Sequence, residues 1–335
     1  MQSRLKYFLL VPFIFLSATN HLPLREFKMS GYAQGTSYSI SYFAIDSLVT
    51  QTQVDSILNV IDLSMSLYKP NSAINKFNKS ETGIELDSHF AKVVQKSFEI
   101  FKDSKGIFDI TVAPLVQYWG FGPKSLTEKP NTQTIENIMQ CVGMDKLELT
   151  KDYLTKKKSC ISIDLNGIAQ GYSVDVVADF MLTKGIKIFV VEIGGELRVK
   201  GPKPDGKTMR IGIEGPSETP NAEPSIKHIM SFTEGAVTTS GNYRKYLTNG
   251  SKKISHLINA KTGYPLDNEM ISATVFAPDA ITADGYDNVL MGMTVKEALT
   301  FVEAHKNLEA YLIYKKPDGK IADTLSAGFR KMIIN

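Results

Sequence analysis

The chain has 335 residues, of which 43% are hydrophobic and 22% are charged, and these are the proportions of an ordinary globular protein. They exclude a disordered or fibrous protein, and the length suffices for one large domain or two smaller ones. The net charge is +3, and +1 without the N-terminal cations Arg4 and Lys6, which argues against a broad nucleic-acid-binding surface.

The first twenty residues have the pattern of a secretory signal. Arg4 and Lys6 precede an apolar run over residues 7–16, and small residues follow at 17–19. The run is shorter than the roughly 20 apolar residues that span a bilayer. We expect residues 1–20 to be a signal peptide or a short N-terminal anchor, and a buried N-terminal helix is the alternative. Residues 21–335 would then form one exported, periplasmic domain, with that segment as the only link to the inner membrane and no cysteine for lipid attachment.

Apolar residues recur at helical spacing in three segments, and a fourth helix is expected to begin near Asp279. Ser88 is the expected N-cap of the second helix. The three apolar stripes are Val54, Ile57, Leu58 and Ile61; Phe90, Val93, Val94 and Phe101; and Val174, Val177, Ala178 and Met181.

Strand-like segments are more numerous than helical ones, and Asn249-Gly250 predicts a tight hairpin between two of them. The strands do not alternate regularly with helices, and no GxGxxG follows a first strand. This favours an α+β fold with largely antiparallel sheets over a Rossmann fold. The expected strands cover residues 37–43, 146–149, 160–164, 188–192, 209–213, 243–247, 254–258, 271–276 and 310–314.

Three further features have ordinary structural interpretations. Residues 215–225 are rich in Pro, Ser and Glu and predict a surface loop. The basic run at 156–158 is expected to be solvated, in a hairpin turn. Cys141 and Cys160 can pair in an oxidising compartment, but without a CxxC or a nearby histidine we expect buried free thiols.

Three segments have the composition of ligand-binding loops. Gln34 begins the sequence Q-G-T-S-Y at a strand start, and Tyr68 lies in a Pro/Asn/Ser loop where its ring can stack on a planar ligand. Asp109 and Thr111 precede an apolar stretch, and Trp119 after it suggests a wall for a flat ligand. A plain strand start, a capping turn and helix capping are the alternatives.

A fourth segment, D-L-N-G-I-A-Q-G-Y at residues 164–172, connects an apolar strand to a helix. Backbone N–H groups of such a turn can face an anion, and Gly167 and Gly171 permit close approach of a ligand. Glycines in this place also occur for packing alone.

A fifth set is His256 together with the sequence A-D-G-Y-D-N at 283–288. On a helix, Asp284, Asp287 and Asn288 share one face, and oxygen ligands on one face suit a hard cation such as Mg²⁺. Helix capping by the aspartates is the alternative. A lone histidine is more often structural than functional.

These segments, taken in order, resemble the ApbE family of flavin transferases, which act on FAD and a protein. The resemblance covers about residues 29–292. It rests on seven motifs, which are G-T-x-Y, S-x-Y-x-P-x-S-x-I, F-D-x-T-V-x-P-L-V with W-G-F-G, D-L-x-G-I-A-x-G-Y-x-V-D, T-S-G-x-Y, H-x-I-x-x-x-T-G-Y-P and A-D-x-x-D.

The resemblance implies a T-fold-like α+β architecture with packed helices, in which FAD and Mg²⁺ bind in a cleft between two lobes. His256 matches a histidine near the reacting phosphate, and Asp284 is the other candidate catalytic residue. The implied metal ligands are the Gly167 carbonyl and the side chains of Asp284, Asp287 and Asn288. The implied FAD contacts are Gln34, Tyr68, Asp109, Ile110, Thr111, Asp164, Gln170 and Ile258.

Four positions depart from the family pattern. Gln34 stands where Met is frequent, Gln170 where Lys or Glu is frequent, and Asn166 where a small residue is common. Asn288 replaces the usual Thr. An amide oxygen is still a hard, neutral donor, but it reaches farther than a hydroxyl and can shift the ion.

The implied activity transfers the FMN half of FAD to a threonine hydroxyl of an acceptor protein, with release of AMP and dependence on Mg²⁺. The implied acceptors are exported segments with a Ser/Thr-rich motif in membrane redox complexes of the NADH:quinone reductase or Rnf type. No nucleic-acid partner is expected. An Mg²⁺-dependent FAD pyrophosphatase would use the same motifs, and a non-catalytic FAD-binding module is the alternative from another class.

Overall fold

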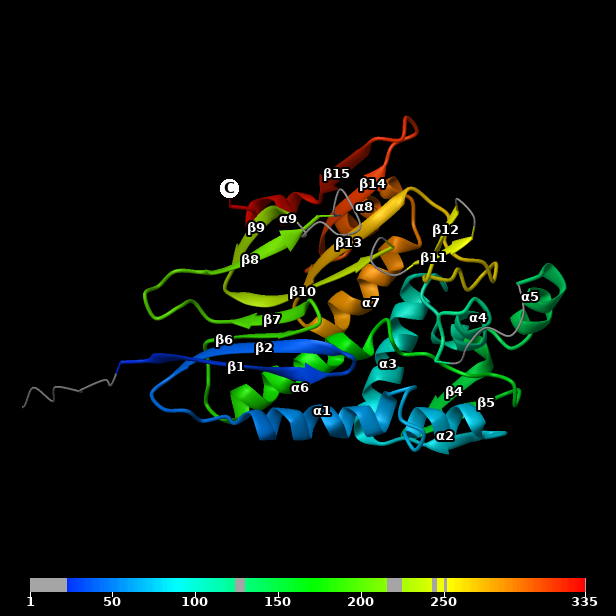
Figure 1. Cartoon of the computed structure of the whole chain (residues 1–335), viewed down its shortest axis with the longest axis horizontal. Coiled ribbons are helices and arrows are strands. Elements are labelled where there is room, and N and C mark those ends of the chain that lie inside the picture. Colours follow the sequence, from blue (N-terminus) through cyan, green and yellow to red (C-terminus); the bar gives the residue numbers. More distant parts are fainter. Residues whose placement is uncertain (1–22, 124–129, 216–224, 243–245, 250–251, 335) are drawn as a thin grey trace, which may run out of the picture.

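The computed structural model describes residues 23–123, 130–215, 225–242, 246–249 and 252–334. Its centre is an eight-stranded sheet in which every neighbouring pair is antiparallel, in the order β1-β2-β6-β7-β10-β13-β14-β15 (Figure 1). These strands are β1 (Arg25–Ala33), β2 (Thr36–Ala44), β6 (Phe189–Ile193), β7 (Glu196–Lys200), β10 (Glu234–Gly241), β13 (Met270–Ala277), β14 (Glu309–Lys315) and β15 (Ile321–Leu325).

Three smaller antiparallel sheets surround the large one. Their strands are β3 (Gly83–Glu85), β5 (Tyr153–Lys156) and β4 (Leu147–Thr150) in the first, β8 (Met209–Glu214) and β9 (Ile226–Phe232) in the second, and β11 (Tyr246–Asn249) and β12 (Lys252–Ser255) in the third.

The described helices lie around the sheets (Figure 1). They are α1 (Gln51–Met65), α2 (Ala73–Lys79), α3 (Ser88–Asp103), α4 (Ala113–Tyr118), α5 (Thr132–Met139), α6 (Ala169–Thr183), α7 (Ala280–Met291), α8 (Val295–Ala304) and α9 (Ala327–Met332), with short 3₁₀ turns η1 (Ile110–Val112) and η2 (Met144–Lys146).

The large sheet is covered on both faces. Helices α6 and α7 contact β6, β7, β10 and β13 on one face. The other face packs against β8, β9 and α9 through a separate apolar cluster that includes Met230, Tyr311 and Phe329. Because both faces of the sheet are buried, the central strands carry apolar side chains on both sides.

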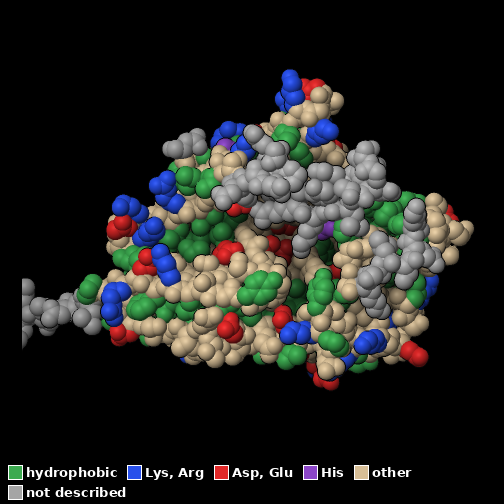
Figure 2. All heavy atoms as spheres, viewed as in Figure 1, with side chains coloured by type: hydrophobic (Ala, Val, Ile, Leu, Met, Phe, Trp, Pro, Cys, Tyr) green, Lys and Arg blue, Asp and Glu red, His purple; other side chains and the backbone are tan. Residues whose placement is uncertain are grey.

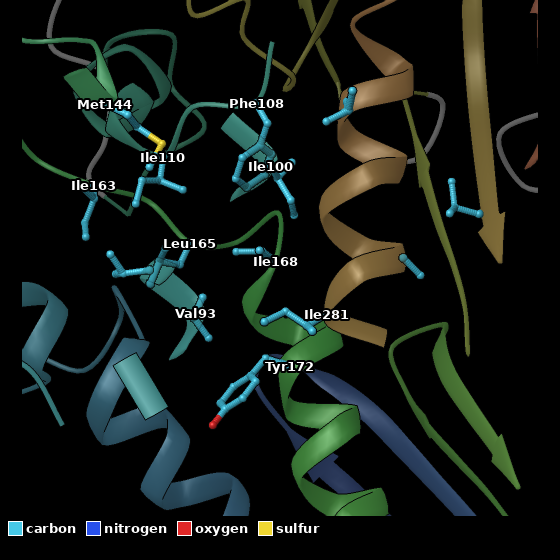
Figure 3. Packing of buried hydrophobic residues seen from close by; sticks show 14 of the residues in the cluster. Val93, Ile100, Phe108, Ile110, Met144, Ile163, Leu165, Ile168, Tyr172 and Ile281 are labelled. Carbon is cyan, nitrogen blue, oxygen red and sulfur yellow. The ribbon is translucent and has the colours of Figure 1, made fainter. Parts of the chain in front are cut away.

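The largest apolar cluster lies between α3, α7 and the loop that leads into α6, where Ile100, Leu165 and Ile168 are completely or almost completely buried (Figure 3). This cluster links the sheet to the helical lobe built from α2–α5. It therefore fixes the two sides of the cleft relative to each other, because close-packed cores resist small displacements.

The α+β prediction with largely antiparallel sheets is confirmed, and so are the four predicted helices, which correspond to α1, α3, α6 and α7. The expected N-cap at Ser88 is wrong by one residue. The cap is Asp87, whose carboxylate accepts hydrogen bonds from the backbone N–H groups of His89 and Phe90. Helix α7 begins near Asp279 as predicted, and Asp279 is its N-cap.

The strand expected at residues 160–164 does not form. The side-chain amide of Asn78 accepts from the N–H of Ile163 and donates to its carbonyl, and the N–H of Asp164 donates to the Ile110 carbonyl. Hydrogen bonds to residues outside the sheets thus take the place of the backbone hydrogen bonds that a neighbouring strand would make. The strand expected at 254–258 ends at Ser255, and η2 occupies the start expected for β4. Residues 216–224, 243–245 and 250–251, which hold the expected loop, part of one strand and the hairpin turn, lie outside the described residues.

The expectation that residues 156–158 form a solvated turn is wrong for Lys156. This residue ends β5, is 4% exposed, and donates from Nζ to the carbonyls of Phe77 and Ile161. Its ammonium also lies 5.1 Å from the centre of the Phe77 ring. Burial lowers the pKa of Lys156.

The expectation of buried free thiols is also wrong. Cys141, just after α5, and Cys160, in the turn after β5, form a disulfide with a Cα–Cα distance of 5.6 Å. The sequence separation gave no sign of this pairing, because the fold of the intervening hairpin β4–β5 brings the two ends together.

Candidate functional site

A cavity of about 1810 Å³ opens between the large sheet and the helical lobe. Pockets for drug-sized ligands have roughly 300–1,000 Å³, so this volume suffices for a dinucleotide. Figure 2 shows the hollow on one face of the molecule, with acidic side chains visible inside it. Eleven of the predicted site residues line the cavity, namely Gln34, Tyr68, Asp109, Asp164, Gly167, Gln170, His256, Ile258, Asp284, Asp287 and Asn288.

Gln34 lies in the two-residue turn that joins β1 to β2. Both turn residues are left-handed, Gln34 with φ 54° and Gly35 with φ 77°, as a type I′ hairpin requires. Gln is an unfavourable choice for this conformation, so the turn stores strain at the edge of the cavity. The side chain is held by a 2.8 Å hydrogen bond from Nε2 to the hydroxyl of Ser173 on α6.

The residues predicted from the helical lobe divide into two groups. Tyr68 is 67% exposed at the cavity, where its ring is open to a ligand. Asp109 lines the cavity and is held by three donors, since Oδ1 accepts from the N–H and hydroxyl of Thr111 and Oδ2 accepts from the N–H of Met144. Burial raises the pKa of Asp109 against the effect of these bonds.

Ile110 and Thr111 do not line the cavity. Both are buried, and the Thr111 hydroxyl accepts from the Gly143 N–H while it donates to Asp109. In this geometry the two residues support Asp109. The suggested ligand wall at Trp119 is wrong: its indole N–H donates to the Gly263 carbonyl, and Phe121 lines the cavity instead.

The loop before α6 offers fewer free N–H groups than the sequence suggested. The N–H groups of Ile168 and Ala169 donate to the Leu165 carbonyl, and the N–H of Gly171 donates to Asp284 Oδ2 at 2.8 Å. Gly171 is required for packing, because a Cβ there would lie 2.3 Å from the Ala280 carbonyl. The predicted anion-binding role of this backbone is therefore not supported for these three groups.

Helix α7 brings Asp284 and Asp287 to the floor of the cavity, where their exposed fractions are 4% and 1%. Asp284 Oδ2 is fixed by Gly171, and Asp287 Oδ2 accepts from the Thr238 hydroxyl at 2.7 Å. In the described part of the chain neither carboxylate has an ion pair with lysine or arginine. Two buried anions one helical turn apart are costly unless a cation joins them.

The electrostatics of the cavity floor reflect this arrangement. Burial, together with repulsion from Asp175, raises the pKa of Asp284 to about 7. Burial, then repulsion from Asp284, raises the pKa of Asp287 well above its ordinary value. Such shifts are typical of a site that takes up a positive charge.

The structure adds Glu196, which the sequence did not single out. This residue begins β7, lines the cavity, and accepts a hydrogen bond from Gln170 Nε2, which also donates to the Ile193 carbonyl at 2.9 Å. Burial, then repulsion from Asp284, raises the pKa of Glu196 well above its ordinary value. The packing of α7 against β7 places this carboxylate near Asp284, so spacing along the chain gave no signal.

Asn288 and the Gly167 carbonyl complete the cavity floor. The Asn288 Nδ2 lies 3.2 Å from the Gly167 carbonyl oxygen and 2.9 Å from Asp287 Oδ1. Among the described residues, no group of three or more His, Cys, Asp and Glu side chains is arranged to hold a metal ion. Two carboxylates supplemented by a backbone carbonyl do fit Mg²⁺, which binds few protein ligands and keeps sites for water and phosphate.

His256 follows β12 and lines the same cavity, with its ring 6.2 Å from that of Phe121 in an edge-to-face contact. Ile258 lies two residues on and forms an isolated bridge with Pro265, so the segment 256–265 folds back as a loop against the lobe.

The described helices include none that is long and apolar enough to cross a membrane.

Known proteins resemble the chain over nearly its whole length. A model of the ApbE family matches residues 34–312. The FAD:protein FMN transferase of Haemophilus influenzae is 34% identical over 318 residues, 91% of each chain. The flavin transferase ApbE from Vibrio cholerae has a TM-score of 0.83 at 32% identity, covering 92% of this chain and 100% of that one. The Pseudomonas stutzeri flavinyl transferase ApbE, apo form, has a TM-score of 0.82 at 27% identity, covering 92% and 97%.

The match of the family model to most of the chain, the extent of the similarity and the cavity with its acidic floor agree. The chain belongs to the ApbE family.

Proposed function

We propose that this protein is an FAD:protein FMN transferase that moves the FMN half of FAD to a threonine hydroxyl of an acceptor protein, releasing AMP with the help of Mg²⁺. The observation that carries the proposal is the buried pair Asp284 and Asp287, without a cationic partner among the described residues, at the floor of a dinucleotide-sized cavity. Relatives named for this activity, 34% identical over 91% of the chain, support it.

The donors on the floor suit the metal. Asp284 and Asp287, with the Gly167 carbonyl, would hold Mg²⁺, and the ion would neutralise charge on the pyrophosphate of FAD; the Asn288 side chain lies beside these donors. Gly171 and Thr238 each fix one carboxylate oxygen, so the two acids are oriented before the ligand arrives.

The remaining lining residues would bind the nucleotide. Tyr68 presents an exposed ring for stacking on a flat ring system. Both Nε2 hydrogen bonds of Gln170 go to protein acceptors, so this side chain offers the ligand its carbonyl oxygen. Asp109, Asp164, Gln34 and Ile258 line the same cavity.

The reaction would be an in-line substitution at phosphorus. The threonine oxygen forms a bond to the phosphorus on the FMN side while the bond from that phosphorus to the bridging oxygen of AMP breaks. His256 is the candidate to orient the hydroxyl and accept its proton, and AMP leaves with the bridging oxygen. Positioning of the two reactants contributes more than any single base in this chemistry.

We also propose that the protein is exported to the periplasm, with residues 1–20 as its signal peptide or short anchor. Those residues lie outside the described part, but the Cys141–Cys160 disulfide supports export, because disulfides persist in oxidising compartments. The acceptor would then be an exported segment of a membrane redox complex of the NADH:quinone reductase or Rnf type, as the family resemblance suggests.

The test is mass spectrometry of an acceptor protein with a Ser/Thr-rich motif after incubation with FAD, Mg²⁺ and this protein. The proposal predicts an FMN-sized mass increase on a threonine, with AMP in solution. Free FMN and AMP without an adduct would instead identify a FAD pyrophosphatase. FAD that stays bound and unchanged would identify a non-catalytic flavin-binding module.

A further inference from the structure

The side chain of Asn288 has an unexpected orientation in the cavity floor. A metal ligand would present its amide oxygen to the ion, whereas here the amide nitrogen faces the other ligands. Its Nδ2 lies 2.9 Å from Asp287 Oδ1, 3.2 Å from the Gly167 carbonyl oxygen and 3.0 Å from the Asp284 carbonyl oxygen.

The surroundings fix this orientation. All three neighbours of Nδ2 are acceptors, so a turned amide would place its oxygen against three oxygens and lose every one of these bonds. On the other side, Oδ1 accepts from the Ser240 hydroxyl at 3.4 Å. The donor edge of the amide therefore belongs on the side of Gly167 and Asp287.

The amide also fills the space beside Gly167. A Cβ added to Gly167 would lie 3.2 Å from Asn288 Nδ2, so the amide packs directly over this glycine. The nitrogen thus bridges the two oxygens, of Gly167 and Asp287, that the proposed ion is expected to bridge. Each N–H directs partial positive charge at its acceptor, and a cation between the same oxygens would be repelled by it.

We propose that Asn288 is a placeholder for the cation and not a ligand through its oxygen. Its amide nitrogen holds the Gly167 carbonyl and Asp287 in place, and it must leave this position for the ion to bind between them. This inference rests on the proposed Mg²⁺ site. Its consequence is weaker binding of the ion than the carboxylates and the carbonyl would give without the amide.

The competition between the Asn288 amide and the ion determines whether a substitution of Asn288 strengthens or weakens Mg²⁺ binding. Removing the amide frees Asp287 Oδ1 and the Gly167 carbonyl, so the ion no longer displaces two hydrogen bonds, one of them to a charged group. Hydrogen bonds to charged groups contribute enough that the dissociation constant for Mg²⁺ should fall roughly tenfold. If the amide oxygen were a ligand, the same substitution would raise the dissociation constant.

The test is calorimetric titration of the full chain with Mg²⁺ in the absence of FAD, for wild type, Asn288→Ala and Asn288→Val. Valine fills the space without a donor or an acceptor, and Asn137→Ala on exposed α5 is the matched control. Tighter binding by both Asn288 variants, with the control unchanged, is the expected result. Equal or weaker binding by the variants overturns the inference alone, and no binding by wild type overturns the proposed metal site with it.

A structure of the wild-type chain crystallised with Mg²⁺ gives a second measurement that does not depend on how the variants fold. The inference expects the ion on the Gly167 carbonyl and the α7 carboxylates with the Asn288 amide displaced from them. Asn288 Oδ1 at the roughly 2.0–2.1 Å ligand distance of Mg²⁺ would overturn it.

Discussion

Helix α7 carries two buried carboxylate sites that differ in how their charge is balanced. At its first turn, Asp175 from α6 accepts from the N–H groups of Ala280 and Ile281 and pairs with Arg198 at 3.0 Å. In the middle of the helix, Asp284 and Asp287 face each other and Glu196, and no described lysine or arginine pairs with them.

Burial raises the pKa of the carboxyl group at both sites, and the two sites differ only in the partners of these groups. It raises the pKa of Asp175 to about 6, while its two backbone donors and Arg198 oppose the shift. It raises the pKa of Asp284 to about 7, where a neighbouring acid adds to the shift. Both carboxylates join α6 to α7, but Asp175 pairs with Arg198, whereas Asp284 has no cationic partner among the described residues.

Among the substitutions, the largest effect on stability is expected from Asp175→Ala. This change leaves the first N–H groups of α7 without their acceptor and removes the buried partner of Arg198, which keeps only Asp179. Hydrogen bonds to a charged group contribute about 1.5–3 kcal/mol, so we expect a loss of roughly 3 kcal/mol in the free energy of unfolding. Urea unfolding measures it, and a loss that added Mg²⁺ fully restores would show that the two sites are not distinct.

Asp284→Asn is expected to have the opposite effect in the absence of metal. The amide keeps the shape of the side chain and removes one of the repelling charges, so the variant in EDTA should be more stable than wild type by about 1–2 kcal/mol. The same variant should lose the stabilisation that Mg²⁺ gives to wild type. Thermal unfolding with EDTA and with Mg²⁺ checks both, and a less stable variant in EDTA would mean that the negative charge of Asp284 is already balanced without the ion.

The stability of the metal-free protein is also expected to depend on pH. Because the pKa of Asp284 is raised in the folded state to about 7, the folded chain holds this proton more tightly than the unfolded chain does. Stability in EDTA should therefore fall as pH rises from about 4 to about 7, by at most about 1.4 kcal/mol per pH unit from this group.

An ion that replaces the proton should cancel this trend. The increase in the unfolding temperature on addition of Mg²⁺ is expected to be larger at pH 7.5 than at pH 5, and Asp284→Asn is the matched control in which the difference disappears. An equal increase in the unfolding temperature at both pH values would mean that the ion does not bind at Asp284.

The same two sites show what the sequence predicts well. The spacing of Asp284, Asp287 and Asn288 placed them on one face of a helix, and α7 puts all three into one cavity. The helical stripe that includes Val174 and Val177 located α6 in the same way. The helical periodicity of apolar residues and the capping of helices are local properties, so a short stretch of sequence is enough to predict them.

What the sequence did not predict depends on contacts between distant segments. Glu196 joins the acidic floor because α7 packs against β7, and Cys141 meets Cys160 because the β4–β5 hairpin closes. Lys156 belongs to a basic run, yet the fold surrounds its ammonium with carbonyls of α2 and of the loop after β5. Such partners have no fixed separation along the chain.

The central claim is that the α7 carboxylates without a cationic partner support FMN transfer by holding Mg²⁺. The most direct test is the mass of an acceptor protein after incubation with FAD, Mg²⁺ and Asp284→Ala, with Asp318→Ala in the exposed β14–β15 turn as the matched control. We expect an FMN-sized adduct with wild type and the control and none with Asp284→Ala. An adduct formed by folded Asp284→Ala at the wild-type rate would contradict the claim.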